Sequence, residues 1–269
     1  MSDAFIPCRK CKDSITPGYL YREKKDPSTG VTYRYREQCD CLKQHKKKEL
    51  VKIRARRIGL RPSIYEQEYN PLTDYVGDKS SDSVMKVVKY VENFDTIYRH
   101  QSLYLYGPNG TQKTTIAQWV ALEMIKAKKN VAYVLMRQFI NALVENQYSR
   151  NDEDPTSKAA REEYIKRVVN SDLLIMDEAF DLSKVTIYKS QYQIPFLDEF
   201  LRDRMDVQEK PIIFVSNVPI NQIDASTFSK SITNLLERQI NSKGASLPFY
   251  DNYQDVANDF NVKDIFSGL

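Results

Sequence analysis

The stretch from Leu103 to Thr115 reads LYLYGPNGTQKTT and decides how the rest of the chain is interpreted. Its apolar and aromatic start is typical of a buried parallel strand. The Gly-Pro-Asn-Gly that follows predicts a turn, and from Lys113 onward the apolar residues have helical spacing. A strand, a glycine-bearing loop and a helix in this order predict a phosphate-binding loop, because backbone N–H groups and a helix N-terminus can surround phosphate oxygens.

The chemistry of this loop indicates a nucleotide with a divalent cation. We expect Lys113 to reach the β and γ phosphate oxygens and the Thr114 hydroxyl to ligate Mg²⁺. Gln112 stands where the P-loop pattern has glycine, so its side chain must point outward or contribute a donor. An accidental glycine-rich turn is the alternative. The predicted loop contacts are Gly107, Pro108, Asn109, Gly110, Thr111, Gln112, Lys113, Thr114 and Thr115.

A second apolar run ends in two acids, Asp177 and Glu178. This pattern resembles a Walker B strand, whose carboxyl end would bring Asp177 beside the phosphate loop to hold Mg²⁺. Glu178 would then polarise the attacking water. Simple strand termination is the alternative for the run alone, but its position after a phosphate loop favours the functional interpretation.

Two further residues complete the predicted catalytic set. Asn217 follows another buried strand and is expected between the two motifs, where it could orient water or touch the γ phosphate. Arg238 lies in a predicted helix over residues 228–240 and is our candidate for an arginine finger offered to a neighbouring subunit. Lys230 is the second candidate, and a surface ion pair is the structural alternative.

The charge of the chain is concentrated at its beginning. Residues 1–60 hold 16 of the 40 Lys and Arg but only 7 of the 36 Asp and Glu, whereas the remainder is slightly acidic. A basic head is typical of a segment that meets nucleic acid or an acidic protein surface. A solvated charged face explains the charge equally well.

All four cysteines lie in this head, at Cys8, Cys11, Cys39 and Cys41. Tyrosines alternate with polar residues on either side of a Pro/Gly turn at 26–30, which predicts a hairpin pairing Tyr21 with about Tyr35. Such a hairpin would bring the cysteines together as a structural Zn²⁺ site. So small a head has little core, and a metal would stabilise it. Free thiols or a redox role are the alternatives, and His45 is a spare ligand.

The other segments are assigned by their periodicity. Residues 42–60 predict a basic amphipathic helix that docks on a partner or packs on the next domain, and residues 63–82 look irregular. Helices are expected at 83–99 and 159–170, a mobile loop at 151–157, and strands at 131–135 and 211–217. We expect a zinc-binding hairpin domain at 1–45, a basic helix and linker at 46–82, and a nucleotide-binding domain at 83–269.

Taken together, these features resemble a DnaC/DnaI-type replicative helicase loader of the AAA+ class. The resemblance rests on the cysteine head, the basic linker, GPNGTQKTT, LLIMDE and FVSN, and on a tail that contains SITNLLER and ASLPFY. It implies an α/β P-loop AAA+ ATPase with a parallel sheet flanked by helices, preceded by the small zinc-binding hairpin domain. It also implies ATP, Mg²⁺ and Zn²⁺ as cofactors and Asn217 as sensor 1.

By the same resemblance, the expected partners are a hexameric replicative DNA helicase, single-stranded DNA and further copies of the chain through their AAA+ domains. The loop at 184–193 is a candidate DNA contact, with an ordinary surface loop as the alternative. No Arg follows Tyr250, where relatives often carry a sensor-2 residue. An IstB-like transposition ATPase and a zinc-bearing adaptor that does not hydrolyse ATP are the alternative functions.

The sequence also makes a prediction about location. Met1 to Lys12 has no apolar core of the kind found in signal peptides, and no apolar run is long enough to span a bilayer. We therefore expect a cytoplasmic protein without a membrane partner, in the bacterial host cytoplasm if the chain is phage-encoded.

Overall fold

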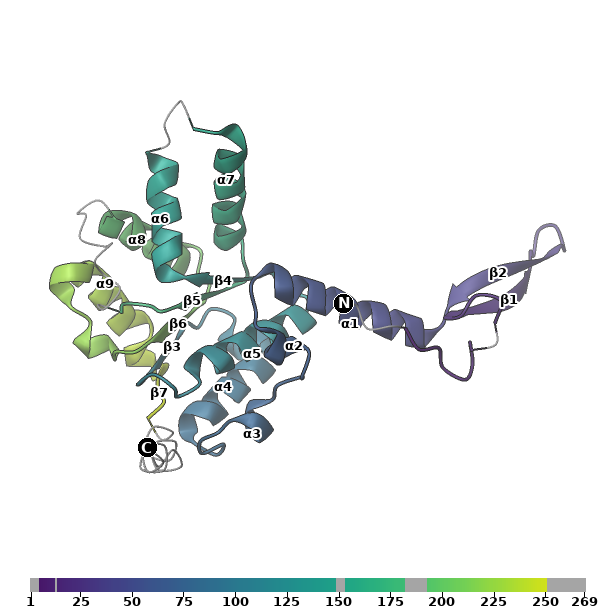
Figure 1. Ribbon diagram of the computed structural model, residues 1–269, viewed down its shortest axis with the longest axis horizontal. Helices are drawn as coiled ribbons and strands as arrows, with labels where there is room; N and C mark the ends of the chain where they lie inside the picture. Colours follow the sequence, from purple (N-terminus) through teal and green to yellow (C-terminus); the bar gives the residue numbers. More distant parts are fainter. Residues whose placement is uncertain (1–4, 13, 149–152, 182–192, 251–269) are drawn as a thin grey trace, which may run out of the picture. The chain divides into compact units, whose positions relative to one another are not determined.

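The structure is a computed structural model that describes residues 5–12, 14–148, 153–181 and 193–250. The chain divides into two compact units, residues 1–57 and 58–269 (Figure 1). The candidate DNA-contacting loop at 184–193 lies outside the described residues except for Gln193. The three-part division at residues 45 and 82 remains a prediction. Among the described helices, none combines the length and apolar character needed to cross a bilayer.

The first unit contains the predicted hairpin. Strands β1 (Tyr19–Lys25) and β2 (Thr32–Gln38) pair antiparallel, with a turn closed by the Gly30 N–H to the Asp26 carbonyl. Tyr21 is paired with Arg36 rather than Tyr35, so the register differs by one residue from the sequence estimate. Because side chains alternate along a strand, Tyr33 and Tyr35 share the face opposite to Tyr21.

The basic helix of this unit is α1 (Asp40–Arg57). It begins between the last two cysteines and ends three residues before the predicted Leu60. Asp40 lies in its first turn, and basic residues lie in its last turn. Both placements are favourable for the helix dipole.

The second unit is built on a five-stranded parallel sheet, as predicted. Its order is β4-β5-β6-β3-β7, and each neighbouring pair is parallel. Apolar residues dominate the central strands because helices cover both faces. The strands are β3 (Leu103–Tyr106), β4 (Val131–Leu135), β5 (Leu173–Asp177), β6 (Ile212–Ser216) and β7 (Ser246–Pro248).

Helices flank this sheet on both sides. Figure 1 shows α4 and α5 on one side and α6, α8 and α9 on the other. The longer helices are α4 (Asp82–Glu92), α5 (Lys113–Lys126), α6 (Met136–Gln147), α7 (Pro155–Val169), α8 (Gln193–Arg202) and α9 (Ala225–Gln239). Short turns complete the unit: π-helical at Phe94–Tyr98 and Asp203–Val207, and 3₁₀ at Ile220–Gln222 and Asn241–Lys243.

Three of the predicted segments differ from the structure. The region expected to be irregular contains two short helices, α2 (Pro62–Tyr65) and α3 (Pro71–Asp74). The helix expected to run to residue 99 changes to a π turn at Phe94. Helix α7 begins at Pro155, inside the expected loop, because the Asp154 side chain caps the Ser157 N–H.

A buried arginine holds three of these elements together. Arg204 is 1% exposed, and its guanidinium donates to the carbonyls of Val168 and Val169 at the end of α7. It also donates to the Ser171 and Pro211 carbonyls, which precede β5 and β6. Arg204 therefore satisfies carbonyls that the ends of these elements leave without partners.

Candidate functional site

The loop at residues 107–112 joins β3 to α5 and has a backbone that only certain residues can adopt. Gly107 has a φ of 148°, and a Cβ there would lie 2.4 Å from the Phe249 carbonyl oxygen. The Phe249 N–H also donates to the Tyr106 carbonyl at 2.8 Å. Glycine is required at this position because the C-terminal strand passes directly over it.

Gln112 occupies the position where the pattern has glycine, and the backbone explains that preference. It adopts a left-handed conformation with φ 58° and ψ 17°, which glycine adopts without steric cost. Its side-chain Oε1 accepts a hydrogen bond from the Val76 N–H at 3.2 Å. The amide oxygen is thus bound to the segment after α3, so the side chain acts there as an acceptor.

Lys113 is the first residue of α5 and is 6% exposed. Its Nζ donates to the Pro108 carbonyl at 2.6 Å and to the Thr111 Oγ1 at 3.1 Å. Burial lowers the pKa of Lys113 to about 8, although the nearby Asp177 raises it. The loop therefore holds a desolvated ammonium group that an anion would stabilise.

Asp177 ends β5 and accepts hydrogen bonds at both carboxylate oxygens. Oδ1 accepts from the Thr114 hydroxyl at 3.2 Å and from the Glu178 N–H at 2.8 Å. Oδ2 accepts from the Tyr133 hydroxyl at 2.5 Å. A hydroxyl and a carboxylate side by side are the oxygen ligands that Mg²⁺ prefers in nucleotide sites, so the residues present fit this cation.

Glu178 and Asn217 lie on the same edge of the sheet as Asp177. Glu178 has a φ of 54°, a costly conformation for a residue with a side chain and one that occurs at functional sites. Asn217 follows β6, which lies between β5 and β3 as expected. Its Nδ2 donates to the Asp181 Oδ2 at 3.0 Å, so the orientation of the amide is set from the loop after β5.

A cavity of about 440 Å³ brings these groups together. Its lining includes Lys113, Asp177, Glu178 and Asn217, which come from loops after three parallel strands. Sequence reasoning missed Arg61, which also lines the cavity. The other predicted residues in the lining are Asn109, Gly110, Gln112, Thr114 and Thr115.

Four of the predicted residues are not part of this lining. Gly107, Pro108 and Thr111 shape the loop from behind, through the contacts given above. Arg238 lies on α9, where its guanidinium donates to the Asp206 Oδ2 at 2.7 Å. This is the surface ion pair considered as its alternative, and its role toward a second subunit remains a prediction.

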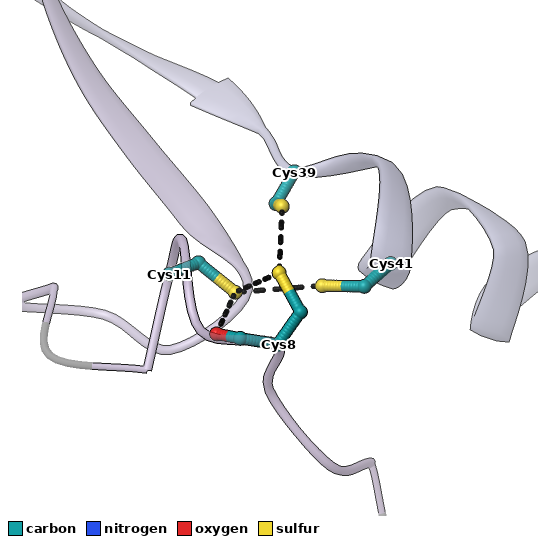
Figure 2. Close-up of side chains that lie close together, drawn as sticks. All are labelled: Cys8, Cys11, Cys39 and Cys41. Atoms are coloured by element: carbon teal, nitrogen blue, oxygen red, sulfur yellow. Dashed lines mark hydrogen bonds between the residues drawn. The ribbon is translucent and has the colours of Figure 1, made fainter.

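The four cysteines form a second cluster, in the first unit. Figure 2 shows their sulfur atoms converging from the N-terminal turn and from the junction of β2 with α1. The sulfur of Cys8 lies 3.8 Å from that of Cys11 and 3.6 Å from that of Cys39, and the sulfur of Cys11 lies 3.4 Å from that of Cys41. All four lie within 4.8 Å of one another.

These distances suit a tetrahedral zinc site, in which Zn–S bonds of about 2.3 Å separate the sulfurs by about 3.8 Å. A hydrogen bond from the Lys10 backbone is the largest effect lowering the pKa of the Cys8 thiol to about 7, which favours the thiolate that a metal binds. His45 is not in the cluster, and its ring packs against Phe5 with centroids 5.3 Å apart. The tight Cys39-x-Cys41 spacing is thus compatible with four sulfur ligands.

Comparisons with known proteins agree with this fold and site. Residues 28–243 match the family model described as IstB-like ATP binding protein. No curated protein matches the chain.

Several solved structures are similar to the chain. AMPPCP-bound DnaA from Aquifex aeolicus is 19% identical with a TM-score of 0.54, over 78% of this chain and 58% of that one. A replication initiator DnaA bound to AMPPCP and single-stranded DNA is 20% identical with a TM-score of 0.51, over 68% and 50%. A structure of DnaI is 16% identical with a TM-score of 0.49, over 74% and 96%. The chain spans little more than half the length of the two DnaA proteins, and these two similarities concern the fold alone.

Proposed function

The chain belongs to the family of IstB-like ATP binding proteins and is an ATPase of the AAA+ class, and we propose that it uses ATP to load a hexameric replicative DNA helicase onto single-stranded DNA. The observation that carries the nucleotide part is the convergence of Lys113, Asp177, Glu178 and Asn217 on one cavity. Parallel strands with polar groups at one edge are the usual ligand sites of α/β proteins.

Within this site, each residue has a proposed task. Lys113 leaves its loop acceptors to bind the β and γ phosphates, and the loop N–H groups bind the remaining oxygens. Thr114 and Asp177 hold Mg²⁺, which neutralises phosphate charge when bound. Glu178 accepts a proton from the attacking water, and Asn217 orients that water.

Communication between subunits is assigned to α9. We expect copies of the chain to assemble through their AAA+ domains, with Arg238 or Lys230 offered to a neighbour's nucleotide. Arg238 would exchange its partner Asp206 for phosphate oxygens on assembly. Its side chain is 60% exposed, so this exchange requires no unfolding.

The cysteine unit is the proposed contact with the helicase. With Zn²⁺ bound to Cys8, Cys11, Cys39 and Cys41, the unit would present a rigid hairpin and the basic helix α1. The positive charge of this region suits an acidic protein surface or the DNA backbone. In this scheme ATP aligns the subunits around single-stranded DNA, and hydrolysis releases the loader.

A second candidate function follows from the family match itself. An IstB-like transposition ATPase would share the nucleotide site but would assemble on duplex DNA and recruit a transposase. The four-cysteine cluster favours the loader, because a transposition ATPase does not obviously need it. Gln112, strained where glycine is usual, favours a third candidate, a zinc-bearing adaptor that binds ATP without hydrolysing it.

The experiment is co-purification of the full chain with candidate helicases, combined with ATP hydrolysis in the presence of helicase and single-stranded DNA. The loader proposal expects a complex with the helicase and turnover that Glu178→Gln abolishes while nucleotide binding remains. Capture of a transposase instead of a helicase would support the second candidate. Turnover no higher than that of the Glu178→Gln control would support the adaptor.

A further inference from the structure

A chain of hydrogen bonds connects Asp177 to the segment where the chain enters the ATPase unit. The Tyr133 hydroxyl donates to the Asp177 Oδ2 at 2.5 Å. The side chain of Gln118 is a hydrogen-bond partner of the same hydroxyl. The Gln118 Oε1 in turn accepts from the backbone N–H of Arg61 at 3.3 Å. No motif in the sequence indicated these contacts, since the three partners of Asp177 come from separate elements.

The middle of this chain is shielded from water. Gln118 on α5 is 3% exposed, Asp177 is 5% exposed, and Tyr133 on β4 is partly buried. Hydrogen bonds in such surroundings are stronger than in water, and an unpaired buried group is costly. Each member therefore restricts the position of the next.

The contact with Tyr133 determines how the Asp177 carboxylate is turned. Oδ2 is occupied by the phenol, so Oδ1 is the oxygen that faces Thr114 and the Glu178 N–H. Thr114 and Asp177 are the residues expected to hold Mg²⁺. Hydrogen bonds to a metal-binding carboxylate orient it and tune its affinity for the metal.

The other end of the chain lies at the boundary of the unit. Arg61 is the fourth residue after that boundary and the N-cap residue of α2. Its side chain lines the same cavity as Lys113 and Asp177. The entry segment at residues 58–62 thus meets the nucleotide site twice, through the Arg61 side chain and through the bond to Gln118.

We propose that Tyr133 and Gln118 are positioning residues that fix the Asp177 carboxylate and couple it to the entry segment at Arg61. Nucleotide with Mg²⁺ in the cavity would then stabilise one position of residues 58–62, from which the chain leads to the cysteine unit. This inference rests on the proposed function, because it assumes that the cavity holds a magnesium nucleotide.

The first test is binding of a fluorescent ATP analogue to the full chain, titrated with Mg²⁺, for the wild type and Tyr133→Phe. We expect Tyr133→Phe to need about tenfold more Mg²⁺ for half of the magnesium-dependent gain in affinity. Binding without Mg²⁺ should stay unchanged. The matched control is Tyr90→Phe, which removes a buried hydroxyl bonded to the Gln101 carbonyl, outside the cavity.

The outcomes separate the two levels of the argument. A wild-type chain that binds no nucleotide overturns the proposed function and this inference together. Normal wild-type binding with the same Mg²⁺ titration in Tyr133→Phe overturns this inference alone. A shift of equal size in Tyr90→Phe also overturns it, because the effect would then be a general loss of packing.

The second test measures the coupling without relying on activity. Hydrogen exchange of a peptide covering residues 58–66 is followed with and without the magnesium nucleotide in the wild type and Gln118→Met. We expect nucleotide to slow exchange several-fold in the wild type, and this slowing to be lost in Gln118→Met. Equal slowing in both proteins would show that Gln118 transmits nothing to the entry segment.

Discussion

Gln112 shows how one residue can depart from a motif while the backbone keeps the geometry of that motif. Its φ of 58° is the left-handed conformation that glycine normally supplies. The hydrogen bond from Val76 to its side chain helps to offset the strain. The phosphate loop is therefore retained, with a different distribution of energy between backbone and side chain.

We predict that Gln112→Gly is more stable than Gln112→Ala by about 1 kcal/mol, the cost of a Cβ in a left-handed backbone. Both variants lose the bond to Val76, so the comparison isolates the backbone term. Urea unfolding followed by circular dichroism measures the difference. Equal stability of the two variants would mean that the loop does not keep residue 112 left-handed.

Lys113 is the residue at which stability and function should separate. Burial lowers the pKa of Lys113 to about 8, so the empty site gains little from holding its charge. We predict that Lys113→Met leaves the free energy of unfolding unchanged or raises it. The same variant should bind nucleotide about 10 to 100 times more weakly, the loss of one or two charged hydrogen bonds.

The measurements are thermal unfolding without ligand and fluorescence titration with an ATP analogue. Lys126→Met is the control, because Lys126 is a surface residue at the other end of α5 and pairs with Glu123. It should leave nucleotide affinity unchanged. Undiminished binding in Lys113→Met would remove Lys113 from the site.

At the scale of elements, the main strands and helices followed from local patterns, and the differences have identifiable causes. Helices α2 and α3 each begin with proline, at Pro62 and Pro71. Proline favours the first position of a helix, so these residues could have been interpreted as starts rather than breaks. The hairpin register differed by one residue because neither of its faces is buried, and an unburied strand does not specify its register strongly.

Arg204 carries the prediction that belongs to this scale. Replacing it with Leu leaves four buried carbonyls without donors, at about 1–3 kcal/mol for each that water cannot reach. We predict that Arg204→Leu destabilises the chain by at least about 3 kcal/mol. Urea unfolding is the measurement.

Arg202 provides the matched control, two residues away. It is exposed and pairs with Asp198 and Ser231 on the surface, and surface pairs contribute about 1 kcal/mol or less. Arg202→Leu should therefore cost far less than Arg204→Leu. Similar costs for the two would contradict the role of Arg204 in joining α7, β5 and β6.

At the scale of the whole molecule, the two units differ in what stabilises them. The ATPase unit has a core buried between helices and sheet, whereas the hairpin exposes Tyr21, Tyr33 and Tyr35 by 37–46%. A unit with so little buried apolar surface needs another source of stability. The four-cysteine cluster is the feature that can supply it.

We predict one Zn²⁺ per chain and a selective effect of its removal. A strong chelator, or Cys11→Ser, should abolish hydrogen-exchange protection in residues 19–38, because metal binding and folding are coupled in such small units. Protection in residues 103–126 and nucleotide affinity should remain. Elemental analysis with hydrogen exchange measures both effects, and a hairpin that stays protected without metal would contradict the zinc assignment.

The sequence by itself determined the nucleotide site and the cysteine cluster, and the structure brings the predicted residues of each together. Both follow from local rules: a glycine loop after a strand, apolar strands that end in Asp177 and Asn217, and the spacing of Cys8, Cys11, Cys39 and Cys41. Parallel strands bring their carboxyl ends to the same edge, so neither prediction required the strand order.

Only the tertiary structure decided which residues surround those sites. Tyr133 reaches Asp177 because β4 lies beside β5, and Gln118 meets Arg61 because α2 packs against α5. Arg204 finds its carbonyls where three element ends meet. Contacts of this kind join residues far apart in the chain, and they exist only once the sheet order and helix packing are set, since a local sequence pattern carries no information about its distant neighbours.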